Sequence, residues 1–395
     1  MMRGMIRSLI AALAALAPVV AYAAPPPATV VVAFDRDTIT PLIVEGLANK
    51  EAGRALEAND PVRIASISKL IMALTALRLM DEGKVDLERD ISDYLGWKLR
   101  SPNHPDAPVT LTHLMLHRAG LSDAAGYIIP LGESLQAKLA DPAAWRDTGP
   151  SGDAAFEYAN IGSPLVATAL EAASGERYDR LVERLVFKPL GVKACFNWIG
   201  CDADMQARAV TLYRDTGELA KDSATDLPPA CTIPVAEGQA CDLESYVPGT
   251  NASIFSPQGG VRIGMMDLAK IGQALAAQDD RILSEQAMEA IFRSFLVGEN
   301  KGQEFFCVYT LHIQYIDVPE TGCQDALFED GVVRGGHSGE AYGLQSGLWI
   351  SDQEGAASFA YFTTQVPPPP GGEDTGGFTA REKALMARAQ AVLAE

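Results

Sequence analysis

The chain has 395 residues, 48% of them hydrophobic, with 32 Lys and Arg against 51 Asp and Glu and a net charge of −19. This length suffices for one large domain or two interlocked ones. Because phosphate backbones are bound through clustered Lys and Arg, so acidic a chain argues strongly against a nucleic-acid partner.

Residues 1–23 are typical of a secretory signal peptide. Arg3 and Arg7 form a basic start, Leu9–Ala17 is apolar, and residues 21–23 fit a small-x-small cleavage site. The apolar stretch is too short to span a bilayer comfortably, and no cysteine follows the cleavage site to carry a lipid. We therefore expect cleavage after residue 23, a periplasmic or secreted product with no stable membrane anchor, and a net charge of −21 once the two arginines are removed.

In chain order, the pattern first predicts two strands, Thr29–Phe34 and Ile39–Leu47, because both are rich in β-branched residues. Ser66–Glu82 predicts a helix that is apolar nearly all round, which is typical of a buried central helix. Residues 84–190 are expected to be mostly helix and loop, with helical patterns over the following ranges: Leu111–Leu116, Pro164–Ala173 and Tyr178–Leu185.

Irregular structure is expected over residues 195–250, which hold many turn formers. Further elements follow, with helices at Met265–Ala277, Ser284–Phe295 and Thr379–Leu393, and strands at Phe305–Ile316, Gly331–Gly336, Tyr342–Ser351 and Ala356–Thr364. The Pro- and Gly-rich residues 367–377 cannot continue a sheet and are expected to form a loop.

Strands at both ends with helices between them predict an α+β fold, an α/β sandwich. Its antiparallel sheet would be built from both termini and flanked by helices, with a mainly helical lobe inserted in the middle. The expected sheet lobe covers about residues 28–83 and 255–395, and the helical lobe about 84–254. A cleft between the lobes is a usual place for a small-molecule site.

The six cysteines fall into near neighbours along the chain. Pairing of these neighbours as disulfides is the favoured hypothesis, although six cysteines permit 15 connectivities, and an oxidising compartment suits it. A metal cluster is the alternative, but the spacings contain no Cys-x2-Cys unit. The disulfide candidates are Cys195 with Cys201, Cys231 with Cys241, and Cys307 with Cys323.

Ser66-Ile67-Ser68-Lys69 stands at the start of the apolar helix. A hydroxyl there faces unpaired backbone N–H groups and the positive end of the helix dipole, and Lys69 lies one turn away on the same face. Serine is a poor nucleophile until a neighbour takes its proton, which a partly buried lysine of lowered pKa can do. The plainer interpretation is that Ser66 caps the helix and Lys69 is solvated.

Two further motifs supply candidate partners. Tyr158 could relay a proton, and Asn160 could orient substrate or Lys69, although Asn160 could equally be a helix N-cap above a packed Tyr158. In His337-Ser338-Gly339, Gly339 would let substrate approach the backbone, and an extended strand could pair with a peptide-like substrate and complete an oxyanion hole. The alternative for this motif is a turn with a surface histidine.

Two further patterns resemble other kinds of site, a nucleophile elbow and a metal site, but each lacks a required residue. Gly336-His337-Ser338-Gly339 resembles a nucleophile elbow, but the second Gly of Gly-x-Ser-x-Gly would fall at position 340, where this chain has Glu340. His113 and His117 have the helical spacing of metal ligands, but no Glu or third ligand accompanies them, so a structural role is favoured.

Taken together, the three motifs resemble those of the serine β-lactamase and penicillin-binding protein superfamily. Tyr-x-Asn with a late His-Ser-Gly is similar to the branch of class C β-lactamases, DD-peptidases and family VIII esterases. Three further stretches are similar to segments of this superfamily: Val109–Leu121, Phe187–Gly191 and Gly259–Arg262. The resemblance covers nearly the whole chain after the signal peptide and is weakest over residues 195–250.

The resemblance implies a β-lactamase-like fold and acyl transfer to serine followed by release with water, without metal or organic cofactor. By motif position, Ser66 would be the nucleophile, and Lys69 and Tyr158 would share the acid and base work. Asn160 would contact substrate and Lys69. The substrate-binding strand would comprise His337, Ser338, Gly339 and Glu340, and the backbone N–H groups of Ser66 and Glu340 would bind the oxyanion.

One departure bears on the substrate. Many β-lactamases and DD-peptidases carry lysine where this chain has His337, and a histidine of ordinary pKa is largely neutral at pH 7, which weakens attraction for a carboxylate. We therefore expect an esterase or D-amino-acid peptidase acting on a small molecule or short peptide, slightly ahead of a class C-like β-lactamase. A penicillin-binding or sensing ectodomain that never turns over is the alternative of another class. The sequence does not indicate protein partners.

Overall fold

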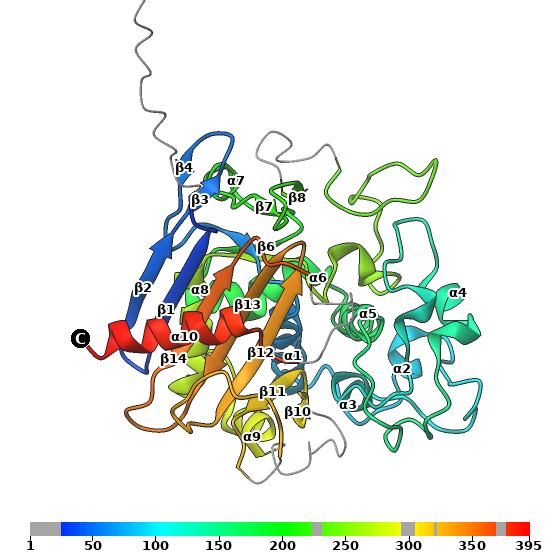
Figure 1. Cartoon of the computed structure of the whole chain (residues 1–395). Coiled ribbons are helices and arrows are strands. Elements are labelled where there is room, and N and C mark those ends of the chain that lie inside the picture. Colours follow the sequence, from blue (N-terminus) through cyan, green and yellow to red (C-terminus); the bar gives the residue numbers. More distant parts are fainter. Residues whose placement is uncertain (1–24, 223–230, 294–304, 320–321, 369–376) are drawn as a thin grey trace, which may run out of the picture.

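The computed structural model describes residues 25–222, 231–293, 305–319, 322–368 and 377–395. Its main sheet has seven strands, and every neighbouring pair is antiparallel (Figure 1). In spatial order the strands are β10 (Val308–Thr310), β11 (Ile313–Ile316), β12 (Arg334–Ala341), β13 (Leu344–Ile350), β14 (Ser358–Thr363), β1 (Thr29–Phe34) and β2 (Ile39–Glu45).

The sheet joins the two ends of the chain, as the sequence predicted. Strand β1 pairs along its whole length with β14, from Thr29 opposite Thr363 to Phe34 opposite Ser358. Six consecutive buried residues form β1, which is what a strand covered on both faces requires. The architecture is therefore α+β with an antiparallel sheet, which confirms the predicted fold class.

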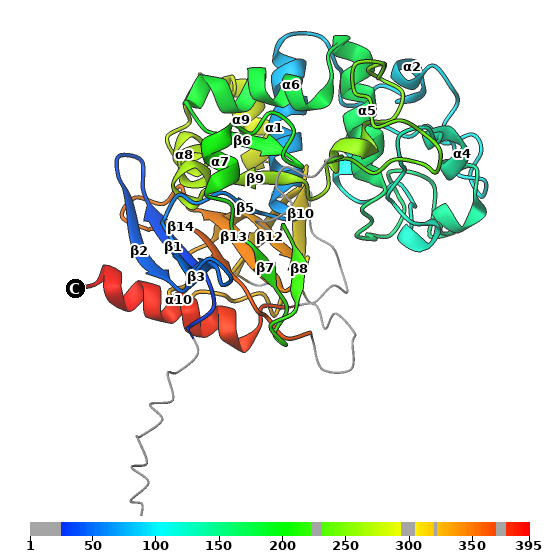
Figure 2. The same ribbon diagram turned by 90° about the horizontal axis from the view of Figure 1, so that it is seen from above.

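Helices cover both faces of this sheet, so the sheet lies between two hydrophobic cores. On one face, Val30 and Val32 pack with α1 (Ile67–Asp81) and α8 (Met265–Ala276). On the other face, Val31 and Ala33 pack with α10 (Ala380–Leu393). Figure 2 shows α10 and α8 on opposite sides of the sheet. Because side chains alternate between the two faces of a strand, one run of β-branched residues contributes to both hydrophobic cores.

A second group of helices, α2 to α5, lies to one side of the sheet, beyond α1 (Figures 1 and 2). The remaining α-helices are α2 (Ser92–Leu95), α3 (Leu111–Met115), α4 (Leu135–Leu139), α5 (Gly162–Ser174), α6 (Tyr178–Val182), α7 (Ala203–Ala207) and α9 (Glu285–Arg293). Short 3-10 turns are η1 (Asp123–Ala125), η2 (Pro142–Ala144), η4 (Lys188–Leu190) and η5 (Ala252–Phe255), and Glu183–Phe187 is a π-helix. The predicted boundaries of the two lobes stay a prediction.

Three small sheets complete the described part of the chain. They pair β3 (Leu47–Asn49) with β4 (Arg54–Ala55), β9 (Val261–Ile263) with both β5 (Val62–Arg63) and β6 (Ala194–Phe196), and β7 (Leu212–Tyr213) with β8 (Leu219–Lys221). The segment 195–250, expected to be irregular, therefore contains short strands and a helix, which its turn formers separate.

Helix α1 is the central helix that its apolar pattern predicted. Twelve of its 15 residues are buried, because α1 lies between the main sheet on one side and α5 and α6 on the other. The residue before its N-cap, Ala65, has a φ of 46°, in the left-handed region that costs a non-glycine residue energy. This strained turn brings the chain from β5 into α1 at Ser66.

Three predictions differ from the structure. The run Ile39–Leu47 is not one strand, because β2 ends at Glu45 and β3 begins at Leu47. Residues 305–316 are not one strand but a hairpin of β10 and β11, which turns at Leu311 and His312, both of positive φ. His337-Ser338-Gly339 does not separate two strands but lies within β12, paired throughout with β13. This rules out a surface turn and a nucleophile elbow, which would place the serine between a strand and a helix.

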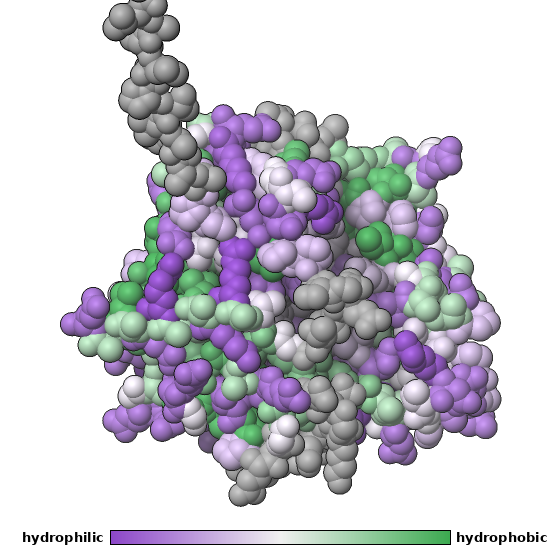
Figure 3. All heavy atoms as spheres, viewed as in Figure 1, coloured by the Kyte–Doolittle hydropathy of each residue, from purple (hydrophilic) through white to green (hydrophobic). Residues whose placement is uncertain are grey.

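Other predictions fall partly or wholly outside the described residues. These are the signal peptide over residues 1–23, the last two residues of the helix expected to end at residue 295, and most of the loop at 367–377. Within the described part of the chain, no helix combines the length and the apolar character needed to cross a membrane. Hydrophilic side chains are spread across the face seen in Figure 3, with small hydrophobic areas between them.

The structure joins the six cysteines as three disulfides between sequence neighbours. They link Cys195 with Cys201, Cys231 with Cys241 and Cys307 with Cys323. This agrees with the pairing favoured from the sequence.

Candidate active site

Ser66 and Lys69 meet at the N-terminal end of α1. Ser66 occupies the N-cap position, but its side chain accepts no capping hydrogen bond from the helix backbone. Instead, the Lys69 ammonium donates to Ser66 Oγ at 3.2 Å. The plainer interpretation, a helix-capping serine beside a solvated lysine, is therefore wrong in both parts.

Lys69 is completely buried, and its environment changes its protonation. Its Nζ donates to Asn160 Oδ1 at 2.8 Å and to the carbonyl of Gln258 at 3.4 Å. Burial lowers the pKa of Lys69 to about 7, and the nearby charge of Asp123 opposes that shift only in part. A lysine that is half deprotonated near neutral pH can accept a proton from the serine to which it is hydrogen-bonded.

Tyr158 lies against the same lysine. Its ring centroid is 4.7 Å from Lys69 Nζ. The ring of Phe306 stacks on the ring of Tyr158, with the two centroids 5.0 Å apart. The ring centroid of His117 lies 4.5 Å from that of Tyr158. The segment 158–160, far from α1 in the sequence, thus delivers its phenol ring and its amide to the Ser66–Lys69 pair.

Asp123, which the sequence analysis missed, orients Asn160. In η1, its carboxylate accepts hydrogen bonds from Asn160 Nδ2, from the Asn160 backbone N–H and from the Ile161 backbone N–H, each at 2.9 Å. With Nδ2 engaged by Asp123, Oδ1 of Asn160 is left to face Lys69. An acidic residue two positions after Leu121 was the available signal, but its spacing says nothing about a contact with residue 160.

His337 differs from what its motif position implied. Its side chain is 0% exposed. Nδ1 donates to the carbonyl of Ser338, and Nε2 accepts from Tyr309 Oη at 2.9 Å. Burial, reinforced by the charge of Lys69, lowers the pKa of His337 to about 3, so the ring is neutral at pH 7. The side chain points into the protein rather than toward a substrate carboxylate.

Gly339 brings β12 against the segment that carries the nucleophile. A Cβ at Gly339 would lie 2.4 Å from the carbonyl oxygen of Ile64 and 2.5 Å from Ser346 Oγ. Ser346 Oγ in turn donates to the Ile64 carbonyl at 3.1 Å. The absence of a side chain at Gly339 therefore permits close packing of backbone on backbone, and the approach of substrate to this glycine stays a prediction.

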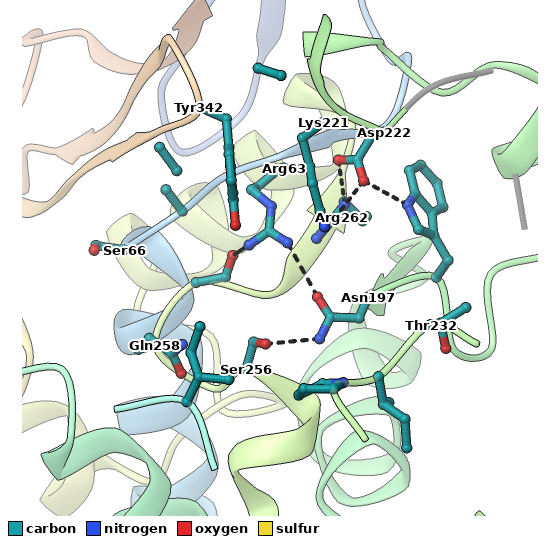
Figure 4. A pocket seen from close by; sticks show the side chains of 18 of the residues that line it. Arg63, Ser66, Asn197, Lys221, Asp222, Thr232, Ser256, Gln258, Arg262 and Tyr342 are labelled. Carbon is teal, nitrogen blue, oxygen red and sulfur yellow. Dashed lines mark hydrogen bonds and ion pairs between the residues drawn. The ribbon is translucent and has the colours of Figure 1, made fainter. Parts of the chain in front are cut away.

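A pocket of about 840 Å³ opens beside Ser66. Asn160, Gln258 and Glu340 also line it, so it lies between the loop before β9, the segment after Tyr158 and the end of β12. Figure 4 shows Ser66 at one side of the pocket and a group of charged side chains at the other. A substrate bound here would have the serine hydroxyl at its side.

Residues 13–381 match the family described as Beta-lactamase. The chain belongs to the β-lactamase family. Its members of known structure include a class C β-lactamase from Rhodobacter sphaeroides, with 17% identity and a TM-score of 0.61 over 93% of this chain and 95% of that one. That likeness supports the fold.

Curated relatives match shorter stretches. The D-alanyl-D-alanine-carboxypeptidase/endopeptidase AmpH of Escherichia coli K12 is 32% identical over 145 residues, which is 35% of this chain and 37% of AmpH. Esterase EstB of Burkholderia gladioli is 29% identical over 170 residues, 38% of this chain and 42% of EstB. The chain thus spans about two fifths of the length of these relatives. Relatives of this chain thus include a carboxypeptidase/endopeptidase and an esterase.

The two histidines of helical spacing do not form a metal site in this β-lactamase-family chain. His113 Nδ1 is bonded to Ser151 Oγ at 2.9 Å, and His117 belongs to a buried group with Tyr309 behind Tyr158. Among the described residues, no group of three or more His, Cys, Asp or Glu side chains is arranged to hold a metal ion.

Proposed function

We propose that this protein is an exported serine hydrolase that cleaves an amide or an ester through an acyl-enzyme on Ser66. The observation that carries the proposal is the 3.2 Å hydrogen bond between Ser66 and a buried Lys69 whose pKa is about 7. A serine so placed has its proton acceptor in position before substrate arrives. Residues 1–23 would direct export, and the three disulfides suit an oxidising compartment.

In the proposed reaction, Ser66 Oγ attacks the substrate carbonyl while neutral Lys69, acting with Tyr158, takes the hydroxyl proton. The backbone N–H groups of Ser66 and Glu340 bind the oxyanion. The C–N or C–O bond then breaks, and the leaving group receives the proton that Lys69 and Tyr158 hold. Water repeats the sequence on the ester of Ser66 and releases the acid and the free enzyme.

Asn160 serves this chemistry by holding Lys69. Its Oδ1 accepts a hydrogen bond from Lys69 Nζ at 2.8 Å. Asp123 accepts a hydrogen bond from Asn160 Nδ2 and so fixes the orientation of the amide group. Removing Asn160 would take away the acceptor that helps to hold Nζ beside Ser66. Asn160 also lines the pocket, so a contact with substrate is open to it.

We place esterase or D-amino-acid peptidase activity slightly ahead of β-lactam hydrolysis. The neutral, buried His337 supplies no positive charge where many β-lactamases carry lysine. A class C-like β-lactamase is the second candidate, favoured by the fold. A penicillin-binding sensor that stays acylated is disfavoured because Lys69 and Tyr158 are both in place for a second proton transfer.

Labelling tests the nucleophile. Ser66→Ala should abolish labelling by a fluorescent penicillin or a fluorophosphonate. Ser68→Ala is the matched control, since Ser68 belongs to the same motif but its buried Oγ accepts from the Val261 backbone N–H. Persistent labelling of Ser66→Ala would mean another nucleophile. Parallel assays with nitrocefin, p-nitrophenyl butyrate and a D-Ala-D-Ala peptide would rank the substrate classes.

A further inference from the structure

The pocket beside Ser66 ends in a group of cationic side chains. Arg63, Lys221 and Arg262 line it, together with the carboxylate of Asp222 (Figure 4). The other carboxylate of the lining, Glu340, is exposed near the end of β12. The far end therefore carries three positive charges against one negative charge.

Asp222 and Arg262 satisfy each other. Arg262 Nε and Nη2 donate to the two oxygens of Asp222 at 3.0 and 2.8 Å, and Trp198 Nε1 also donates to Asp222 at 3.0 Å. Both side chains are buried. This bidentate pair is complete without a ligand, so the excess positive charge of the pocket belongs to the other two cations.

Arg63 is a buried cation bonded only to neutral groups in the described part of the chain. It is 8% exposed, and its guanidinium donates to the Gly259 carbonyl and, at 3.3 Å, to Asn197 Oδ1. Its Nε has no partner there. Burial first, and then the charge of Arg262, lower the pKa of Arg63 to about 10, and the attraction of Asp222 is the smaller effect. The guanidinium is still charged at neutral pH and has no anion bonded to it, a costly arrangement for a buried charge.

Tyr342 lies between Arg63 and Lys221 at the cationic end of the pocket. Its ring centroid is 5.2 Å from Arg63 Cζ and 5.7 Å from Lys221 Nζ. Tyr342 and Gly343 form the two-residue turn between β12 and β13, with φ values of 56° and 75°, as in the type I′ turns that join strands tightly. The turn places the ring in the lining of the pocket, beside both cations (Figure 4).

The lining of the pocket also includes exposed apolar side chains. Ile128, Leu219 and Tyr342 are large hydrophobic residues that line the pocket and yet are more than a third exposed. Exposed apolar groups gathered at a concave site are typical of ligand contacts. The pocket therefore combines exposed apolar side chains with a cationic end.

The position of the pocket indicates which part of the substrate enters it. Ser66 and Glu340 line it, but Tyr158 and His337 do not. In the proposed mechanism the leaving group must face the proton donors Tyr158 and Lys69, so the portion in this pocket is the acyl portion. Lys69 and Arg63 bind the adjacent carbonyls of Gln258 and Gly259, which holds the reacting end and the cationic end at a fixed spacing.

We propose that Arg63 and Lys221 bind an anionic group, a carboxylate, on the acyl part of the substrate, with Tyr342 packing against the chain that leads to it. This assignment rests on the proposed function, since it presupposes that Ser66 is acylated. It names the substrate class as esters or amides of dicarboxylic or acidic acyl groups, with the anion held away from His337.

Two esters of equal chain length test the assignment: 4-nitrophenyl hydrogen adipate, which ends in a carboxylate, and 4-nitrophenyl hexanoate, which does not. The wild-type enzyme should favour the adipate ester. Arg63→Met should reduce the ratio of kcat/KM for adipate over hexanoate by about 10- to 100-fold, as expected for loss of a charged hydrogen bond. Arg63→Lys should restore part of that ratio, and Lys221→Met, at an exposed site, should reduce it about threefold to tenfold.

Lys193→Met is the control, because Lys193 is exposed and pairs with Asp202 away from the pocket. It should leave the ratio unchanged. Fluorophosphonate labelling of each variant verifies that the site has folded. An unaltered ratio in both Arg63→Met and Lys221→Met, with labelling intact, would overturn the assignment while leaving the proposed function standing.

A binding measurement separates this assignment from the hydrolytic function. By calorimetry, the monoamide of adipic acid should bind the wild-type protein more tightly than hexanamide, and Arg63→Met should remove the difference. That result supports the anion site even if neither ester is turned over, in which case the proposed function fails alone. Equal binding of the two amides by the wild-type protein would refute the anion site.

Discussion

Replacing Lys69 with methionine should make the protein more stable in mild acid while abolishing its activity. In the folded chain the pKa of Lys69 falls from 10.5 to about 7, mainly through burial. One pKa unit corresponds to about 1.4 kcal/mol, so keeping this side chain ionised costs the folded state roughly 5 kcal/mol below pH 7. Methionine fills similar space and carries no charge.

The cost must fall as the pH rises. Between the folded pKa of about 7 and the unfolded value of 10.5, the unfolded chain retains a proton that the folded chain has lost. The free energy of unfolding of the wild type therefore increases by about 1.4 kcal/mol per pH unit over that range. By pH 9 the penalty of Lys69 has shrunk to roughly 2 kcal/mol.

The variant also loses the hydrogen bond from Nζ to Asn160, which offsets about 1–3 kcal/mol of its gain. Lys69→Met should then be more stable than the wild type by roughly 2–4 kcal/mol at pH 6 and nearly equal to it at pH 9. The change of about 3 kcal/mol between the two pH values does not depend on the size of that offset.

Urea unfolding of both proteins at pH 6 and pH 9, with the disulfides intact, measures this change. Lys193→Met, at an exposed ion pair, serves as the control, and its difference in free energy of unfolding from the wild type should be nearly the same at both pH values. Should Lys69→Met and the wild type differ by the same free energy at both pH values, the lowered pKa of Lys69 would be refuted. Fluorophosphonate labelling of the wild type gives a second reading, since the neutral fraction of Lys69 and the acylation rate should rise roughly tenfold from pH 6 to pH 8.

Three further predictions concern Asp123, Gly339 and the disulfides. Asp123→Asn should slow acylation about tenfold and move its pH profile toward acid, because the charge of Asp123 raises the pKa of Lys69; an unmoved profile would contradict this. Gly339→Ala should destabilise the protein by about 1–3 kcal/mol in thermal unfolding, since its Cβ would meet backbone, whereas Gly377→Ala, with open space around it, should be neutral. Non-reducing mass mapping should recover only the three neighbour disulfides, and any peptide joining Cys195 to Cys307 speaks against them.

Local patterns predicted much of the fold because they act over a few residues. The β-branched run Thr29–Phe34 is β1 residue for residue, and the apolar run that became α1 begins at the residue after Ser66. Thr379, expected at the start of the last helix, is its N-cap and forms a capping box with Glu382. The run 305–316 was mistaken for one strand because nothing in its composition marks a turn at Leu311.

The residues of the candidate site also differ in whether a local pattern predicts that they are close together. Ser66 and Lys69 are three residues apart on one helix, so their proximity follows from helix geometry. Tyr158 and Asn160 could be proposed as partners from their chemistry and from the family resemblance, but no local pattern predicts their proximity, because contacts across 90 residues leave no local signal. Asp123, by contrast, carried no motif at all.

The order of residues alone determined which groups could react: a serine and a lysine one helical turn apart, a phenol, an amide and a strand rich in small residues. The tertiary structure decided their chemical state. Burial in a core assembled from both ends of the chain makes Lys69 a base and His337 a neutral ring, and it leaves Arg63 charged without a bonded anion. Desolvation depends on what surrounds a group in space, and those neighbours come from segments that the sequence lists far apart.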